Sequence, residues 1–348
     1  MDALLSTRRR ALLAGAAGAA ALAACGRRAA RDELHFGGET MGTTYSVKIA
    51  HAADAPRDAL HEAVHAAFDR VDRGMSLYRA DSELARFNRH RGGPFVMSAQ
   101  MFEVLAAAQG VSELTRGAFD VTVAPLVASW GFGPDRRQAV PARATLAAQR
   151  GLVDYRALRL EPASRSIAKA NAAVNADLNG IAKGYGVDLA ARALDAHGID
   201  NYLVEAGGEL RARGVNASGE PWRIGIEQPD AFPQRARFVA PLADRAMATS
   251  GDYRIYVERD GARYCHEIDP ARAAPIDHGL ASVTVVAADC TRADALATAL
   301  IVLGIDKGFA LAQANGIAAY FIQRDGARLQ DRMTSAFAAL GGRRAEPA

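Results

Sequence analysis

Apolar side chains recur at helical spacing along several stretches of the chain. Between Arg57 and Met75 they repeat every three or four residues, which predicts an amphipathic helix that stops near Gly74. A short helix capped by Ser82 or Asp81 is expected to follow. The same periodicity predicts helices over four further ranges: 99–115, 144–153, 293–303 and 307–315.

Alternating and β-branched runs lie between these helices. Residues 36–49 begin with turn residues and end in a strand pattern, with Met41 and Gly42 at the start of the strand. Residues 282–286 form an unbroken apolar run, which predicts a strand buried on both faces. The other predicted strands and hairpins lie in the ranges 158–169, 201–214, 222–227, 246–257 and 318–322. This mixture predicts an α+β fold of mixed sheets with flanking helices, formed by residues 36–340.

Composition agrees with a large folded core. The chain has 348 residues, 50% of them hydrophobic, and a formal net charge of +3. This composition excludes a disordered chain. The body of the chain has no basic run interleaved with aromatic residues, so we do not expect nucleic acid as a partner. The three cysteines, Cys25, Cys265 and Cys290, form neither a zinc-binding pattern nor a disulfide framework.

The N-terminus is typical of an export signal. A basic segment precedes an apolar run that ends at Ala24 and is too short to span a bilayer. The order Thr7-Arg8-Arg9 resembles a twin-arginine signal, and residues 22–25 resemble a lipobox. We therefore expect a signal peptide over residues 1–25, a lipid on Cys25, a linker over residues 26–35, and attachment to the periplasmic side of a bacterial inner membrane. A plain cleaved signal is the alternative.

The stretch from Asp177 to Asp188 places an acid, two glycines and a lysine at the start of a predicted helix. Asp177 and Asn179 stand where N-capping residues belong, and Lys183 lies in the first turn. A helix N-terminus with an added lysine suits a phosphate or pyrophosphate group. From this stretch alone an ordinary capped helix with a surface lysine is the better explanation, because neither of the common glycine-rich phosphate-binding motifs is present.

Other polar residues have both a chemical and a structural interpretation. Asp294 and Thr298 are four residues apart on a predicted helix, so their side-chain oxygens lie on one face and would suit Mg²⁺ together with a backbone carbonyl group. Alternatively, Asp294 only stabilises the first turn of the helix and Thr298 only hydrogen-bonds to the helix backbone. Asp120 would bind a base or ribose edge, or cap a turn. His266 lies at a strand end and is explained equally well as a turn residue. We expect Tyr78 to be a packed core residue, with an exposed stacking ring as the alternative.

Eight motifs, in this order, resemble those of the ApbE family of FAD:protein FMN transferases. The resemblance covers residues 36–322, and eight motifs in the same order are far more specific than any one of them. The motifs are Met41-Gly-Thr-Thr-Tyr-Ser46, Ser76-Leu-Tyr78 with residues 81–88, Gly117-Ala-Phe-Asp120, Asp177-Leu-Asn-Gly-Ile-Ala-Lys-Gly184, Val204-Glu-Ala-Gly-Gly-Glu209, Ala248-Thr-Ser-Gly-Asp-Tyr253, His266-Glu-Ile-Asp-Pro270 and Ala293-Asp-Ala-Leu-Ala-Thr298.

The resemblance implies an exported, magnesium-dependent enzyme that moves FMN from FAD onto a Ser or Thr hydroxyl of an acceptor protein and releases AMP. The acceptors it implies are flavoproteins with a flavinylation motif, such as subunits of respiratory electron transfer. The implied FAD contacts are Met41 and Tyr78 at the flavin, Ala118, Phe119 and Asp120 at the adenosine, and Asp177, Lys183 and His266 near the phosphates. The implied metal ligands are Asp294, Thr298 and the carbonyl group of Gly180. The candidates for the general base are Asp252 and His266.

The chain departs from the family pattern beside His266. The family usually has a Thr-Gly pair in the loop that here reads Ala271-Arg-Ala-Ala-Pro275, and Glu267 replaces an apolar residue. Ala273 enters positive φ less freely than glycine, so we expect a differently shaped loop. Two other functions therefore remain open: an FAD pyrophosphatase that yields FMN and AMP, and a periplasmic lipoprotein that binds FAD without turnover.

Overall fold

The computed structural model describes residues 33–345, apart from residues 53–54, 135–139, 230, 232, 254, 260–261 and 327. The predicted signal peptide and Cys25 lie outside the described residues. Residues 33–35, which we assigned to a linker, are part of the first strand, so the folded unit begins earlier than predicted. It also continues past residue 340, because Arg343 and Arg344 pair with another strand.

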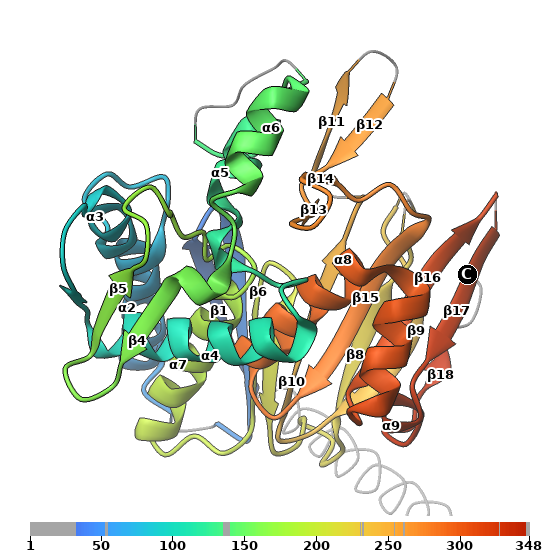
Figure 1. Ribbon diagram of the computed structural model, residues 1–348. Coiled ribbons are helices and arrows are strands. Elements are labelled where there is room, and N and C mark those ends of the chain that lie inside the picture. Colours follow the sequence, from blue (N-terminus) through green and yellow to red (C-terminus); the bar gives the residue numbers. More distant parts are fainter. Residues whose placement is uncertain are drawn as a thin grey trace, which may run out of the picture.

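An antiparallel sheet organises the molecule (Figure 1). Its eight strands lie in the order β1-β2-β6-β7-β10-β15-β16-β17, and every neighbouring pair is antiparallel. The strands are β1 (Glu33–Thr40), β2 (Thr43–Ala50), β6 (Tyr202–Ala206), β7 (Glu209–Arg213), β10 (Arg245–Gly251), β15 (Leu280–Ala287), β16 (Ala318–Asp325) and β17 (Arg328–Met333).

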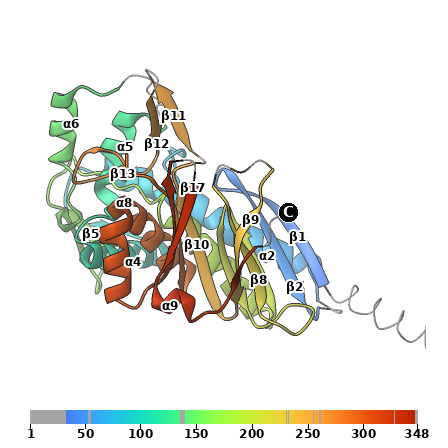
Figure 2. The same cartoon turned by 90° about the vertical axis from the view of Figure 1, so that its right-hand side faces the viewer.

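Helices cover one face of this sheet and a smaller sheet covers the other (Figure 2). The main helices are α2 (Arg57–Met75), α4 (Ala99–Thr115), α7 (Ala182–Ala196) and α8 (Cys290–Ala314). Helix α8 is apolar enough to cross a membrane by length and composition, but 56% of its apolar window is buried, as in a core helix. The smaller sheet, β18-β9-β8, consists of Arg343–Arg344, Ala236–Leu242 and Trp222–Glu227.

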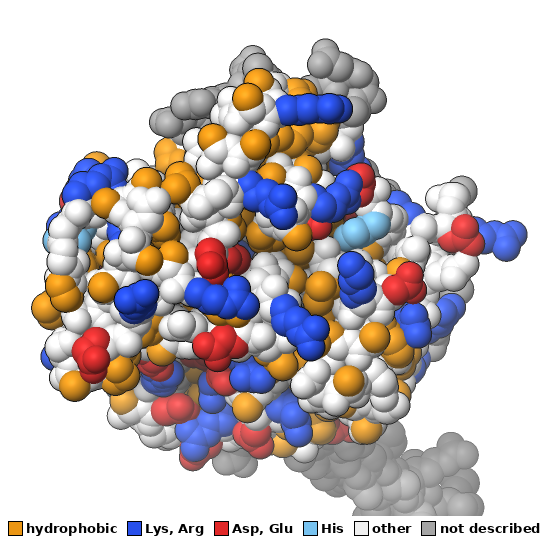
Figure 3. Space-filling model, in the orientation of Figure 1, with side chains coloured by type: hydrophobic (Ala, Val, Ile, Leu, Met, Phe, Trp, Pro, Cys, Tyr) orange, Lys and Arg blue, Asp and Glu red, His pale blue; other side chains and the backbone are white. Residues whose placement is uncertain are grey.

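Shorter elements form the rest of the described chain. They are α3 (Glu83–Arg89), β3 (Phe95–Val96), η1 (Val121–Val123), α5 (Ala124–Trp130), α6 (Arg143–Arg150), η2 (Tyr155–Ala157), β4 (Leu158–Glu161), β5 (Ser166–Lys169), β11 (Tyr256–Arg259), β12 (Ala262–Cys265), β13 (Ile268–Asp269), β14 (Ala274–Pro275) and α9 (Ser335–Ala338). The molecular face in Figure 3 carries acidic and basic side chains interspersed among apolar ones.

The periodic helices are confirmed. Helices α2 and α4 have the predicted bounds, and the Ser82 hydroxyl accepts a hydrogen bond from the Ala85 N–H at the start of α3. The two helices predicted within residues 293–315 meet at Gly304, whose φ of 75° and ψ of 175° interrupt α8. Strand β15 is buried over nearly its whole length, as its unbroken apolar run predicts.

Two local predictions are wrong. Residues 36–49 form a hairpin of β1 and β2 rather than a turn followed by one strand, and Met41 lies in its turn with a φ of 45°. Helix α7 begins at Ala182 and its N-cap position is Ile181, which makes no side-chain capping bond. Asp177 therefore does not cap the helix.

Candidate active site

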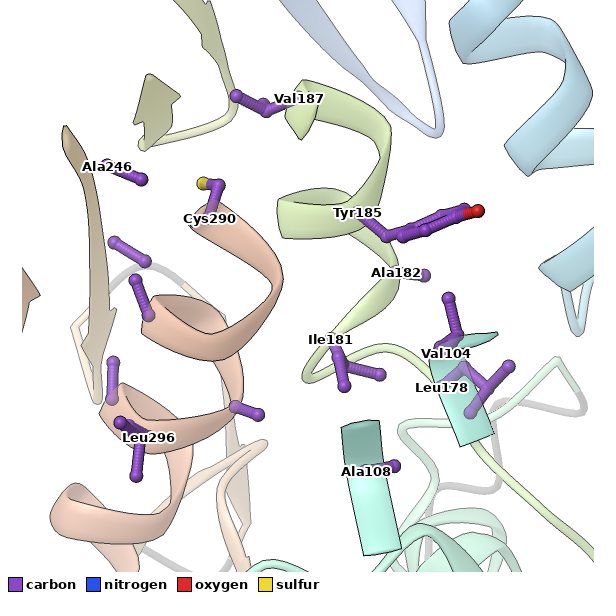
Figure 4. Close-up of a cluster of buried hydrophobic side chains, with 14 of the residues drawn as sticks. Val104, Ala108, Leu178, Ile181, Ala182, Tyr185, Val187, Ala246, Cys290 and Leu296 are labelled. Carbon is purple, nitrogen blue, oxygen red and sulfur yellow. The ribbon is translucent and has the colours of Figure 1, made fainter. Parts of the chain in front are cut away.

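The first turns of α7 and α8 meet at Gly184. Its backbone N–H donates a hydrogen bond to Oδ2 of Asp294, at 2.9 Å. A Cβ atom added at Gly184 would lie 2.8 Å from the Cβ atom of Asp294 and closer still to the carbonyl oxygen of Cys290. Figure 4 shows Ile181, at the N-cap of α7, and Ala182 and Tyr185 of α7 beside the first turns of α8, which carry Cys290 and Leu296. Glycine is required here because the helix backbones approach so closely.

Asp294 and Thr298 come together with Gly180 at this crossing. A Cβ atom at Gly180 would lie 3.1 Å from Oγ1 of Thr298, so the backbone before α7 lies directly against that hydroxyl group. Asp294 is 3% exposed, and Oγ of Ser250 lies 3.2 Å from Oγ1 of Thr298. Burial raises the pKa of Asp294, although the charge of Lys183 opposes the rise.

Hard oxygen donors are therefore gathered where the sequence suggests a metal ion. Only Oδ2 of Asp294 accepts a hydrogen bond from the described residues, which leaves its other oxygen for a cation. No group of three or more His, Cys, Asp or Glu side chains in the described part of the chain is placed to hold a metal. One carboxylate, one hydroxyl and one carbonyl group still suit Mg²⁺, which commonly takes few protein ligands and keeps water or phosphate oxygens.

Lys183 lies in the first turn of α7, as predicted, and is paired with a carboxylate that sequence reasoning did not identify. Its Nζ atom lies 2.5 Å from Oε1 of Glu209, a residue 2% exposed at the start of β7. Burial lowers the pKa of Lys183, but the charges of Glu209 and Asp294 outweigh it, so the pKa is raised. Glu209 belongs to the Val204–Glu209 motif and was therefore visible in the sequence, but no local pattern pairs that motif with Lys183.

Asp177 precedes α7 in an Asx turn. Its Oδ1 atom accepts a hydrogen bond from the Asn179 N–H at 2.8 Å, and the side chain is buried. Burial raises its pKa to about 6, while the Asn179 hydrogen bonds and the charge of His266 oppose the rise. Among the described residues no hydrogen bond or ion pair joins Asp177 to His266, so their place in one site stays a prediction.

His266 lies between a carbonyl group and a carboxylate. Its Nδ1 atom lies 3.2 Å from the carbonyl oxygen of Ile255, and Nε2 lies 3.6 Å from Oε1 of Glu267. The ring of Phe132 meets the imidazole edge to face, with 6.5 Å between centroids. These contacts orient the imidazole, which is the requirement for a side chain that accepts a proton at a defined position.

Asp252, the other candidate base, is engaged by Arg324 of β16. The guanidinium group donates two hydrogen bonds to the two carboxylate oxygens, at 2.7 and 2.9 Å. A bidentate pair of this kind satisfies both carboxylate oxygens. Asp252 is thus held as an ion-pair partner, and Arg324 is a second residue that the sequence prediction missed.

The segment of Ala118, Phe119 and Asp120 leads into η1. The Asp120 carboxylate accepts hydrogen bonds from the Thr122 N–H, the Thr122 hydroxyl and the Tyr155 N–H, at 2.6–2.9 Å. The turn-capping interpretation of Asp120 is therefore correct, and a role at the adenosine stays a prediction. Phe119 is buried, and its Cε2 atom lies 3.2 Å from the position a Cβ at Gly180 would take, so this segment supports the metal candidates.

Met41 and Tyr78 contact different parts of the site. The Tyr78 hydroxyl group donates a hydrogen bond to the carbonyl oxygen of Phe132, at 3.4 Å, and the ring of Phe132 faces His266. The Cε atom of Met41 lies 2.9 Å from the position of a Cβ at Gly186, so the β1–β2 turn touches α7 one turn beyond Lys183. Tyr78 is 62% exposed, so the core interpretation is wrong and the exposed-ring alternative is correct. A depression of about 580 Å³ adjoins the turn, lined by residues 39–44 with His65, Asp69 and Asp72.

Comparison with known proteins decides the family. The model of the ApbE family matches residues 41–321. The chain belongs to the ApbE family.

ApbE relatives match nearly the whole chain. The relative from Vibrio cholerae is 42% identical over 319 residues, which cover 91% of this chain and 94% of the relative, and is named FAD:protein FMN transferase. The one from Haemophilus influenzae carries the same name, at 42% identity over 92% and 95% of the two chains. The apo structure of Pseudomonas stutzeri flavinyl transferase ApbE covers 88% of this chain and 96% of its own, at 43% identity and a TM-score of 0.81. The predicted α+β fold is confirmed.

The loop in which this ApbE chain departs from the family pattern keeps a glycine-like conformation. Ala273 has a φ of 55°, so this alanine adopts the left-handed region that glycine enters more freely. A loop shaped differently from that of other family members stays a prediction. The indole N–H of Trp130 donates a hydrogen bond to the carbonyl oxygen of Ala273, at 3.0 Å. Glu267 is buried, and burial raises its pKa although the charge of His266 opposes the rise.

Proposed function

We propose that this chain is a magnesium-dependent FAD:protein FMN transferase that attaches FMN to a Ser or Thr hydroxyl of an acceptor protein and releases AMP. Family membership supports the transfer of FMN from FAD to a protein. The observation that carries the proposal is the convergence of Asp294, Thr298 and Gly180 beside Lys183. Buried oxygen ligands and a cation in one place suit a reaction at a pyrophosphate.

The metal ligands in this proposal are the Asp294 carboxylate, the Thr298 hydroxyl and the Gly180 carbonyl group. A glycine at position 180 fits the role because any side chain there would press on the Thr298 hydroxyl. When bound, Mg²⁺ would neutralise charge on the phosphate groups. Lys183 and the N-terminal turn of α7 supply further positive charge to the same groups.

FAD would lie along the residues that the family motifs indicate. Met41 and the exposed ring of Tyr78 would contact the flavin. Ala118, Phe119 and Asp120 would support the adenosine, with Asp120 acting through the turn it caps. Asp177, Lys183 and His266 would lie near the pyrophosphate.

The transfer step forms one phosphorus–oxygen bond and breaks another. The acceptor hydroxyl oxygen attacks the FMN phosphorus, AMP leaves with the bridging oxygen, and the hydroxyl proton passes to a base. We assign the base to His266 rather than Asp252, because Arg324 occupies both oxygens of Asp252. Replacing each residue by alanine distinguishes them: His266→Ala should abolish transfer while FAD still binds, and a transfer rate equal to the unaltered protein would exclude His266.

The proposal includes the site of action. A lipid on Cys25 would hold the enzyme at the periplasmic side of the inner membrane, where exported flavoproteins are its acceptors. Subunits of respiratory electron transfer that carry a Ser or Thr flavinylation motif are the acceptors we propose. Labelling of the exported protein with a radioactive fatty acid, and its loss in Cys25→Ser, tests the anchor.

The direct test is incubation of the protein with FAD, Mg²⁺ and an acceptor domain that carries a Ser or Thr flavinylation motif. We expect a fluorescent acceptor band on a denaturing gel, which disappears with EDTA and with Asp294→Ala. Release of AMP without a labelled band would indicate an FAD pyrophosphatase instead. Tight FAD binding without either product would indicate a flavin-binding lipoprotein and would contradict the proposal.

A further inference from the structure

The Lys183 ammonium group is paired with one buried carboxylate, Glu209, and its backbone neighbour Gly184 is hydrogen-bonded to another, Asp294. It contacts Glu209 at 2.5 Å, and the charges of both Glu209 and Asp294 raise its pKa. Both acidic side chains are almost completely buried, whereas the side chain of Lys183 is 33% exposed. Among the described residues, no hydrogen bond or ion pair joins Lys183 to Asp294, so the ammonium group is held by one of its two acidic neighbours.

The turn before β7 holds Glu209 in place. Gly207 and Gly208 have φ values of 62° and 102°, which glycine adopts without strain. A Cβ atom at Gly207 would lie 3.0 Å from Cγ2 of Thr43 and 3.5 Å from Oε2 of Glu209, so the turn is closely packed. Oε2 of Glu209 is buried and has no hydrogen-bond partner in the described part of the chain. Lys183 is therefore the group that compensates this carboxylate.

We propose that Glu209 is a positioning residue that keeps the Lys183 ammonium group away from Asp294. This leaves the Asp294 carboxylate for the metal ion and directs Lys183 to the phosphate groups of FAD. The inference rests on the proposed function, because it concerns the same metal and the same phosphates.

The reason is competition between two cations for one carboxylate. An ammonium group on a side chain that is two-thirds buried is destabilised when it loses its counter-ion, so it moves to the nearest available anion. If Glu209 carried no charge, that anion would be Asp294. A lysine bound to Asp294 would have to be displaced before a divalent ion could bind there, and the apparent metal affinity would fall.

Glu209→Gln tests this, because glutamine keeps the size of the side chain and removes its charge. Binding can be followed with Mn²⁺, which takes the same oxygen ligands as Mg²⁺, through the electron paramagnetic resonance signal of the free ion. We expect the dissociation constant for Mn²⁺ to rise roughly tenfold, the factor expected if an ion pair of modest strength must be broken first. Glu113→Gln, at an exposed position of α4, is the control and should leave Mn²⁺ binding unchanged.

The double variant Lys183→Gln/Glu209→Gln makes the test specific. Removing the ammonium group as well should restore Mn²⁺ binding to at least the affinity of the unaltered protein, a coupling that general damage to the fold would not produce. Unchanged Mn²⁺ binding in Glu209→Gln, or a double variant as weak as the single one, would overturn the inference. So would an unaltered protein that binds no Mn²⁺.

These binding measurements need no turnover. They distinguish failure of the inference from failure of the transferase proposal, which is decided by whether the acceptor is labelled. Mn²⁺ binding that follows the expected order in a protein that never labels its acceptor would support the role of Glu209 and contradict only the proposed reaction.

Discussion

Gly184→Ala is the substitution whose effect follows most directly from the structure. The added Cβ atom would lie 2.8 Å from both the carbonyl carbon of Cys290 and the Cβ atom of Asp294. Neither atom lies at the end of a flexible side chain, so no rotamer change can relieve the contact. Helix α7 must therefore move away from α8, and the hydrogen bond from Gly184 N–H to Asp294 lengthens or breaks.

The expected change in the free energy of unfolding combines two losses and one gain. Overpacking of a closely fitted interior costs about 1–3 kcal/mol. Loss of a hydrogen bond to a charged group costs about 1.5–3 kcal/mol more. The higher helix propensity of alanine returns about 1 kcal/mol. The free energy of unfolding should therefore fall by about 1.5–5 kcal/mol, and metal binding should weaken because Asp294 shifts.

Gly110→Ala is the matched control. Gly110 is exposed in the middle of α4, and a Cβ atom there would meet nothing within 4 Å. The control should raise the free energy of unfolding by about 0.5–1 kcal/mol. Urea unfolding followed by circular dichroism measures both variants, and Mn²⁺ binding reports on Asp294. The reasoning is refuted if Gly184→Ala is as stable as Gly110→Ala and binds Mn²⁺ normally.

Three further predictions concern the same site. Asp177→Asn should be more stable than the unaltered protein above pH 6, by up to about 3 kcal/mol, and equally stable below pH 4. Burial raises the pKa of Asp177 to about 6, so the unaltered protein loses stability as the pH rises from about 4 to about 6 and this carboxyl group ionises. Urea unfolding across this pH range measures the difference, and a difference that does not change with pH would contradict the prediction. Ala273→Gly should raise the melting temperature, with a gain of about 1 kcal/mol from relief of the positive φ, and a lower melting temperature would contradict it. Tyr78→Ala should weaken FAD binding about tenfold in a fluorescence titration without destabilising the fold, because the ring is exposed; unchanged binding would exclude stacking on FAD.

Elements with a strong repeat were predictable from the sequence. The bounds of α2 and α4 follow from apolar positions that recur on one helix face, because that face must be buried whatever lies opposite. The run in β15 predicted its burial on both faces because only a central strand tolerates such a run.

The prediction was wrong at glycines that allow close packing of two strands rather than a turn. Gly37 and Gly38 looked like turn residues but lie inside β1. A Cβ atom at Gly37 would lie 2.5 Å from the carbonyl oxygen of Tyr45, and one at Gly38 would meet the ring of Tyr45. The requirement for glycine comes from β2, so the pattern of β1 alone could not reveal it.

The candidate site shows the same limit. The spacing of Asp294 and Thr298 on one helix face was readable because it is local. The pairs Lys183–Glu209 and Asp252–Arg324 join residues 26 and 72 positions apart. Each pair forms only because the fold places a particular strand near a helix, or two strands on either side of β15, and no local pattern records that placement.

The loop around Ala273 shows how surroundings can determine a conformation that the residue itself disfavours. Alanine in the left-handed region costs about 1–2 kcal/mol relative to an ordinary helical conformation. The hydrogen bond from Trp130 and the burial of Ala273 hold the backbone there. Trp130 ends α5, which follows Phe119 and Asp120 after the short helix η1. The chain from Phe119 to Trp130 therefore contacts both Gly180, beside the metal candidates, and the loop that contains Ala273. Contacts that lie outside the loop therefore offset the strain of the left-handed alanine.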